Sequence, residues 1–146
     1  MIDSLPEHVA FFLDANVLIS AAWKANAEVA GIWHLEGVRL FTSIYVMAEV
    51  QRNLPQVSQI ERLRGFMTSV KDLTFPEYIR SPPDFPEMLL LPEKDRHVLA
   101  AAILARADDL ITGDKRHFSQ WFGKTVHGLK IEPPTELLRT FRLRRP

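Results

Sequence analysis

Apolar and polar positions follow two periods along this chain, and each change of period marks a predicted element. An unbroken apolar run from Val9 to Leu13 is typical of a strand buried on both faces, and the predicted strand, about 9–14, ends on a bare carboxylate, Asp14. From Val17 the apolar residues recur at helical spacing, which predicts a helix over about 16–23. Further short strands are predicted at 38–43, 73–75, 110–112 and 128–131.

Helical periodicity fills most of the sequence between these strands. Gly37 and Pro55 are natural helix stops, and Pro92 followed by acidic residues is a typical helix start. Helices are therefore expected at about 25–36, 44–54 and 56–70, from Pro92 into an alanine-rich stretch, and from Pro133. The prolines between 76 and 92 predict an irregular surface connection. Strands alternating with helices favour an α/β fold with a mainly parallel central sheet and helices on both faces.

The composition narrows the class of protein further. A chain of 146 residues fits one domain, here expected over 1–138 with a basic tail at 139–146. Lys plus Arg equals Asp plus Glu at 18 each, so binding to nucleic acid would require a local basic patch. The absence of cysteine excludes disulfides and thiolate metal sites. With neither a signal peptide nor a membrane-spanning stretch in the sequence, a cytoplasmic location is expected.

Four carboxylates stand at the ends of the predicted strands or on the helices that follow them. Each has a structural explanation when it is taken singly. Asp14 is a preferred N-cap residue, Glu49 is of a type usually solvated on helices, and Asp95 is placed to stabilise a helix dipole. Asp114 follows Gly113, and a Gly-Asp pair is common in turns.

Taken together, these positions fall near the carboxyl edge of a parallel sheet, where chemistry collects in open α/β folds. Carboxylates converging there without basic partners would repel one another, and a hard divalent cation such as Mg²⁺ or Mn²⁺ would relieve that repulsion. Zinc is disfavoured, because cysteine is absent and the five histidines show no ligand spacing. A cation held in this way activates water and bridges phosphodiester oxygens, which is the chemistry of metal-dependent nucleases.

Four segments in this order resemble the successive motifs of the PIN-domain family. The segments are 13–18 (LDANVL), 48–50 (AEV) with 52–54 (RNL), 92–103 (PEKDRHVLAAAI) and 110–118 (LITGDKRHF). The resemblance covers roughly residues 9 to 138. It implies a Rossmann-like three-layer fold, an acidic Mg²⁺ or Mn²⁺ site and cleavage of single-stranded RNA. Many small bacterial members resemble the VapC toxins of toxin–antitoxin pairs, which a cognate antitoxin inhibits and which often form homodimers.

The resemblance also implies roles for particular residues. Asp14, Glu49, Asp95 and Asp114 match the acidic positions, with Asp14 and Asp95 as the expected primary metal ligands and the other two completing the site. Asn16 and Thr112 match the supporting polar positions. The chain departs from the pattern where many toxins have Asn at position 114 and another acid at position 117. The fourth ligand and any second metal stay open. His117 is a candidate for a phosphate contact, but the favoured interpretation is a packed or surface residue.

The sequence offers several candidates for substrate contacts, and each has an alternative structural explanation. Lys115 and Arg116 adjoin the predicted site and are candidates for phosphate contacts, although such residues often only solvate a surface. The arginines of the basic tail have the same two interpretations. Trp23 is a candidate for stacking on bases, whereas Trp33 and Trp121 are expected to pack inside.

Two other functions compete with the metal-dependent ribonuclease. A PIN fold without catalysis would serve as an RNA-binding or protein-interaction module. An aspartate-nucleophile phosphotransferase would use Asp14, but such families usually need a second Asp two residues on, where this chain has Asn16. The apolar residues after Trp23 would serve either a homodimer interface or the core. The RNA target and the existence of an antitoxin are not encoded in any motif found here.

Overall fold

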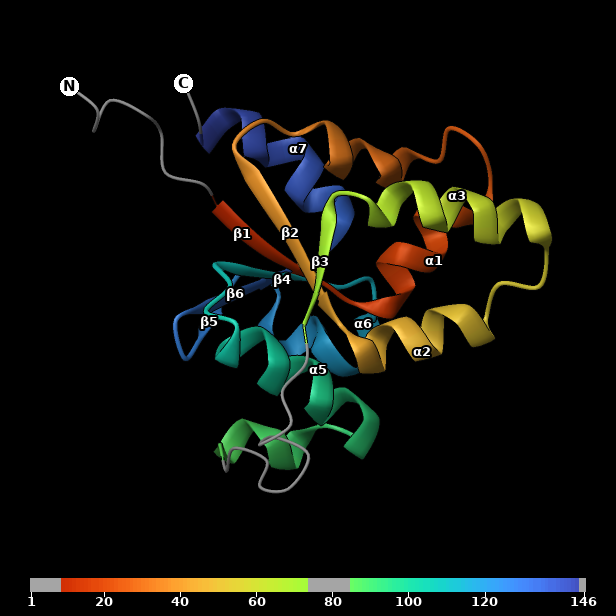
Figure 1. Cartoon of the computed structure of the whole chain (residues 1–146). Helices are drawn as coiled ribbons and strands as arrows, with labels where there is room; N and C mark the ends of the chain where they lie inside the picture. Colours follow the sequence, from red (N-terminus) through yellow and green to blue (C-terminus); the bar gives the residue numbers. More distant parts are fainter. Residues whose placement is uncertain (1–8, 74–84, 145–146) are drawn as a thin grey trace.

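The computed structural model describes residues 9–73 and 85–144, and its centre is a six-stranded sheet in the order β3-β2-β1-β4-β6-β5 (Figure 1). Five of these strands are parallel, and β5 runs antiparallel to β6. The strands are β1 Val9–Leu13, β2 Val38–Ser43, β3 Val70–Leu73, β4 Asp109–Ile111, β5 Thr125–Val126 and β6 Leu129–Glu132. The predicted α/β class with a mainly parallel sheet is confirmed.

Strand β1 lies between β2 and β4, which explains its continuous apolar sequence. The side chains of Phe11, Phe12 and Leu13 are fully buried. In the sheet register Phe11 pairs with Leu40 on one side and with Asp109 on the other. A strand hydrogen-bonded along both edges and covered on both faces has no solvent-exposed side, so alternating polar residues would be costly there.

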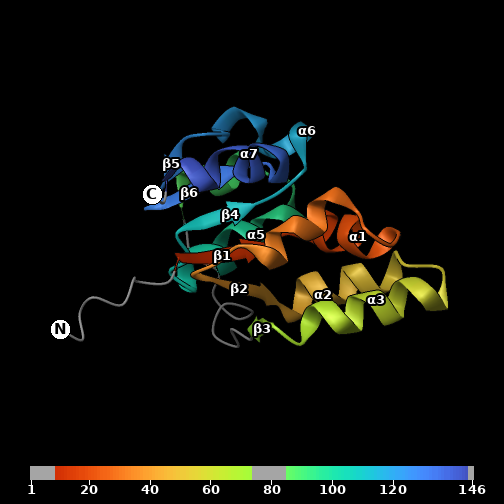
Figure 2. The same cartoon turned by 90° about the horizontal axis from the view of Figure 1, so that it is seen from above.

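Helices cover both faces of the sheet. Figures 1 and 2 show α7 and the 3₁₀ helix η2 on one face and α5 on the other. The α-helices are α1 Ala15–Trp23, α2 Ile44–Arg52, α3 Val57–Met67, α5 Glu93–Leu104, α6 Lys115–Phe118 and α7 Pro134–Arg144. The 3₁₀ helices are η2 Glu28–His34, η3 Pro86–Leu90 and η4 Ser119–Trp121.

The predicted α-helix at 25–36 is instead the shorter 3₁₀ helix η2. Gly31 in its middle lowers α-helix propensity and permits close packing, since a Cβ there would lie 3.3 Å from the Leu138 side chain of α7. Ile32 is fully buried, and Trp33 packs against the core while its indole N–H donates to the Phe66 carbonyl. The apolar residues after Trp23 therefore serve the core.

The third and last strands begin at different residues from those predicted. The helix expected over 56–70 ends at Met67, and Val70 starts β3 because it pairs with Leu40 in the sheet. Residues 74 and 75 of the predicted strand lie outside the described part. Strand β5 was not predicted from the sequence, because it is only two residues long. It joins β6 through a turn in which His127 and Gly128 both have positive φ, as a type I′ hairpin requires.

The final helix is longer than expected. Helix α7 continues to Arg144, so the arginines assigned to a basic tail from position 139 begin inside this helix. Arg139 forms an ion pair with Glu136 one turn earlier, which lowers the pKa of that carboxyl. None of the helices in the described residues is long and apolar enough to span a membrane.

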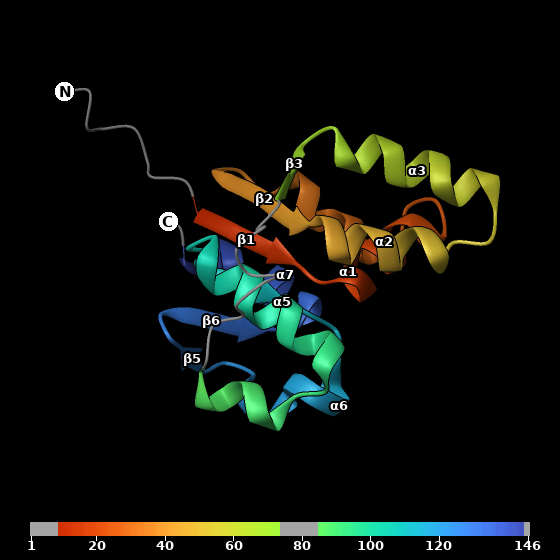
Figure 3. The same ribbon diagram turned by 60° about the horizontal axis from the view of Figure 1, so that its bottom comes forward.

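The parallel register brings the ends of β1 and β4 side by side. Leu13 pairs with Ile111, so the next residues, Asp14 and Thr112, are neighbours at the carboxyl edge. The Asp14 backbone N–H donates to the Ile111 carbonyl at 3.0 Å, which fixes this junction. Figure 3 shows β1 and β2 pointing towards α1 and α2, with α6 at the same end of the sheet. The carboxyl edge of the sheet therefore carries Asp14 and Thr112 side by side, as the strand ends predicted.

Candidate metal centre

Asp14 caps helix α1 with one carboxylate oxygen and presents the other to the sheet edge. Its Oδ1 accepts a hydrogen bond of 2.7 Å from the backbone N–H of Ala15. Its Oδ2 accepts one of 2.7 Å from the Thr112 hydroxyl. Only 4% of the residue is exposed. The capping interpretation therefore accounts for half of the carboxylate, and the other half belongs to a buried polar cluster.

Burial dominates the protonation of Asp14. Its pKa is raised to about 6, mainly by removal from water and in smaller part by the nearby charges of Asp95 and Glu49, while the hydrogen bonds from Thr112 and Ala15 act in the opposite direction. Such a carboxylate is held in its charged form at a cost. A cation beside it would remove that cost, which is the electrostatic condition for a metal ligand.

Asn16 and Thr112 tie the start of α1 to the loop after β4. The Asn16 amide nitrogen donates to Asp14 Oδ2 at 3.2 Å, and its oxygen accepts from the Gly113 N–H at 2.6 Å. Thr112 Oγ1 also accepts from the Asp114 N–H at 3.1 Å. A Cβ on Gly113 would lie 3.2 Å from Asn16 Oδ1, so glycine permits this close approach. The two predicted supporting residues thus hold Asp14 and the Asp114 backbone in one hydrogen-bonded unit.

Asp95 lies in the first turn of α5 and is 6% exposed. Its Oδ2 is buried and accepts no hydrogen bond from the described residues. Burial raises its pKa, the negative charges of Asp114 and Glu49 add to that rise, and His117 and Lys94 oppose it. An interaction with the helix dipole explains its place in the sequence, but not a buried oxygen that accepts no hydrogen bond from the described residues.

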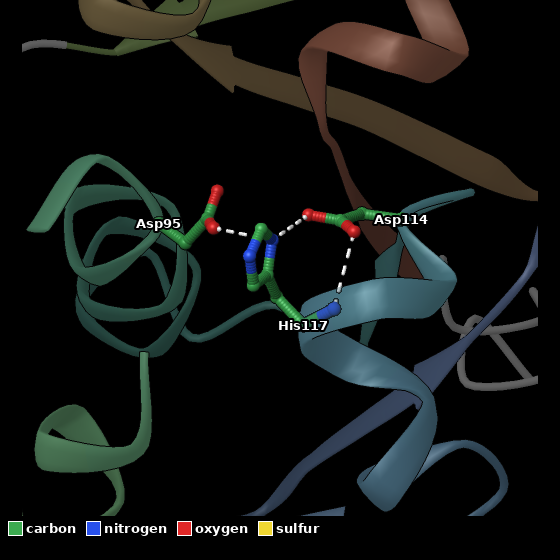
Figure 4. A group of neighbouring side chains, drawn as sticks. All are labelled: Asp95, Asp114 and His117. Carbon is green, nitrogen blue, oxygen red and sulfur yellow. Dashed lines mark hydrogen bonds and ion pairs between the residues drawn. The ribbon is translucent and has the colours of Figure 1, made fainter. Parts of the chain in front are cut away.

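His117 lies between Asp95 and Asp114, and Figure 4 shows its ring separating their carboxylates. Its Nδ1 is 2.8 Å from Asp114 Oδ2 and 3.1 Å from Asp95 Oδ2. Asp114 also caps α6 through Oδ1, which accepts from the His117 N–H at 3.2 Å. Within the described part of the chain, the ligand atoms of these three residues gather within 4.8 Å of one another.

His117 is half-buried and packs between two carboxylates, contacts that its interpretation as a packed or surface residue did not include. The spacing of the histidines in the sequence did not indicate this position, because the partners of His117 are two carboxylates and not a second histidine. The signal present in the sequence was the three-residue step from Asp114, which places both side chains on one side of a short helix. The approach of Asp95 from α5 required the fold.

Glu49 is near this group without joining it. It lies on α2, is half-buried, and its charge contributes to the raised pKa values of both Asp14 and Asp95. One turn before it, Tyr45 stacks on the His97 ring of α5 with centroids 5.0 Å apart. That contact, which the sequence did not suggest, fixes α2 against α5 and so Glu49 relative to Asp95.

The candidate substrate-binding residues are accessible. Lys115 and Arg116 are exposed at the start of α6, beside Asp114. Trp23 is 49% exposed, whereas Trp121 is buried and Trp33 is hydrogen-bonded within the fold, as expected. The basic side chains next to the carboxylates are therefore positioned at the surface.

The chemistry of the cluster fits a small divalent cation. Asp95 and Asp114 offer carboxylate oxygens and His117 offers one imidazole nitrogen, while Asp14 and Glu49 add negative charge nearby. The buried Oδ2 of Asp95, which accepts no hydrogen bond from the described residues, is an open ligand position of the kind that a cation satisfies. Carboxylate oxygens suit Mg²⁺ and Mn²⁺, and an imidazole nitrogen suits first-row transition metals.

Replacing Thr112 by valine tests the hydrogen-bonded unit around Asp14. The change keeps the side-chain shape but removes the donor to Asp14 Oδ2 and the acceptor for the Asp114 N–H. We expect the metal-free protein to lose about 1–3 kcal/mol of unfolding free energy, measured by urea denaturation, because Asp14 Oδ2 loses its shortest hydrogen bond and the Asp114 N–H loses its acceptor. Thr112→Ser keeps the hydroxyl and is the control. A Thr112→Val variant as stable as wild type would contradict this role of the hydroxyl.

The sheet order, the layers and the polar carboxyl edge together define a PIN-like α/β fold. Among solved structures, the chain is similar to a chain of the crystal structure of VapBC2 from Rickettsia felis bound to a DNA fragment from their promoter. The TM-score is 0.57 at 16% sequence identity, over 86% of this chain and 98% of that one. No protein-family model and no curated protein matches the sequence. At this identity the similarity concerns the fold.

Proposed function

We propose that this protein is a metal-dependent endoribonuclease that cleaves single-stranded RNA and acts as the toxin of a toxin–antitoxin pair. The observation that carries the proposal is the group of Asp95, Asp114 and His117 at the carboxyl edge of a PIN-like sheet, with Asp14 linked to it through Thr112 and through the charge of Asp95. Asp14 and Asp95 are buried, and neighbouring carboxylates raise their pKa values, which supports a role in binding a cation more than a purely structural role.

Each residue then has a chemical task. Asp14 and Asp95 would be the primary ligands of Mg²⁺ or Mn²⁺, with Glu49 and Asp114 completing the site directly or through water. A divalent cation there supplies charge stabilisation at the phosphate and lowers the pKa of a bound water. One of the two outer carboxylates would orient the attacking water, and Thr112 and Asn16 would keep Asp14 aimed. Lys115 and Arg116 would contact the RNA phosphates.

The toxin assignment rests on the kind of structure that this chain resembles. The similar chain comes from a VapBC2 complex bound to promoter DNA. By that similarity we propose a protein antitoxin as partner and a cytoplasmic setting. The product of a neighbouring reading frame that co-purifies with this chain and suppresses its cleavage would support the assignment. Cleavage that no neighbouring product suppresses would remove the toxin role while leaving the nuclease.

The deciding experiment is cleavage of a panel of labelled single-stranded RNAs. The purified protein is assayed with Mg²⁺, with Mn²⁺ and with EDTA. We expect cutting with either metal, no cutting with EDTA, and recovery when metal is returned in excess. Cutting that persists in EDTA would sink the metal-dependent mechanism. Metal binding with no cleavage of any RNA in the panel would favour the non-catalytic RNA-binding or interaction module.

A further inference from the structure

We propose that His117 is itself a metal ligand, so that this centre prefers Mn²⁺ over Mg²⁺. This inference rests on the proposed function for its biological use, although the binding it describes is measured separately. It concerns the imidazole Nδ1, which lies between Asp95 and Asp114 (Figure 4). The resulting donor set combines carboxylate oxygens with one nitrogen.

The distances around His117 are those of neighbouring ligands on one small ion. Its Nδ1 lies 2.8 Å from Asp114 Oδ2 and 3.1 Å from Asp95 Oδ2. Two adjacent ligand atoms on an octahedral ion with bonds of about 2.1 Å are about 3 Å apart. The three ligand atoms already lie within 4.8 Å of one another, so a cation bound among them would replace the hydrogen bond between His117 Nδ1 and Asp114.

The hydrogen bonds leave this position incompletely satisfied. A single Nδ1–H cannot serve both carboxylates, and it bonds to Asp114. Asp95 Oδ2, on a side chain that is 9% exposed, accepts no hydrogen bond from the described residues, although it lies 3.1 Å from the same nitrogen. A cation bound at this point would satisfy both carboxylates and the imidazole nitrogen together. The Nδ1 proton would leave to solvent on binding, as metal binding to histidine requires.

The nitrogen decides which metal the site favours. Mg²⁺ takes oxygen ligands almost exclusively, whereas first-row transition metals accept imidazole readily. A site with two carboxylates and one imidazole should therefore discriminate more strongly for Mn²⁺ than one built from acids alone. Position 117 sets this preference, and an aspartate there should return the site to an all-oxygen donor set.

The test is metal binding to the full chain, measured without RNA. Calorimetric titrations with Mn²⁺ and with Mg²⁺ compare wild type, His117→Asp and His117→Gln. We expect the ratio of Mn²⁺ to Mg²⁺ affinity to fall about tenfold or more in both variants. Electron spin echo spectroscopy of the Mn²⁺ complex should show a directly bound nitrogen in wild type and none in the variants. His34→Gln, an exposed histidine on η2, is the matched control and should change neither result.

Three results would overturn the proposal. One is the absence of bound nitrogen in wild type, and another is an unchanged metal preference in folded His117→Asp. The third is tighter binding of both metals to His117→Gln, since that would make His117 a cation that occupies the centre instead of a ligand. Failure of the proposed function is distinguishable: bound nitrogen without RNA cleavage supports the ligand and removes the nuclease. A folded chain that binds neither metal contradicts both.

Discussion

Asp95→Asn is expected to abolish metal-dependent RNA cleavage while leaving the fold intact. Asparagine keeps the size of the side chain and one oxygen, but removes the negative charge at a buried position facing Asp114 and His117. Metal catalysis supplies several kcal/mol of transition-state stabilisation, so the expected loss is on the order of 10²–10³-fold or more. Single-turnover cleavage at saturating Mn²⁺ measures it, with circular dichroism to verify folding.

Glu93→Gln is the matched control for this change. Glu93 lies in the same first turn of α5, two residues earlier, and is exposed. It carries the same charge and shares the helix dipole, so a loss due only to helix electrostatics would appear in both variants. We expect Glu93→Gln to cleave within about threefold of wild type, the scale of an exposed charge near a helix end. Equal activity in wild type and Asp95→Asn would show that another protein in the preparation does the cutting.

The sequence predicted the fold because the relevant signals are local. An apolar run such as 9–13 cannot be accommodated at a sheet edge, and the switch to helical spacing after Asp14 marks the strand end within one residue. Where tertiary packing decides, prediction failed. Val70 belongs to a strand because Leu40 lies beside it, and the stretch around Gly31 tightens into a 3₁₀ helix against Leu138.

The candidate site divides along the same line. The positions of Asp14, Thr112 and Asp114 at the carboxyl edge follow from strand ends that are visible in the sequence. What the sequence does not contain is the approach of α5 to α6, which brings Asp95 within 3.1 Å of His117. No sequence spacing relates residues on separate helices. The sequence therefore shows a histidine at position 117, but not that it lies between Asp95 and Asp114.

Without metal, Asp14→Asn is expected to stabilise the protein at neutral pH. The Asp14 carboxyl has a pKa of about 6 in the fold against a reference value of 3.8. The folded protein therefore binds more protons than the unfolded chain between these values, and the free energy of unfolding falls as the pH rises through that window. A shift of about two units corresponds to about 3 kcal/mol at neutral pH, and an imperfectly matched amide returns about 1 kcal/mol or more. The net gain should be about 1–2 kcal/mol.

Urea unfolding of both proteins in EDTA, from about pH 4 to pH 8, tests this linkage. The advantage of Asp14→Asn should appear only above the reference value, grow until the folded pKa is passed, and then stay constant. Saturating Mn²⁺ should reverse the order, because only the wild-type carboxylate gains the binding free energy of the ion. A variant that is less stable than wild type by the same amount at every pH would mean that the buried charge carries no net cost. Asp14 would then be a capping residue whose main role is to hold the start of α1.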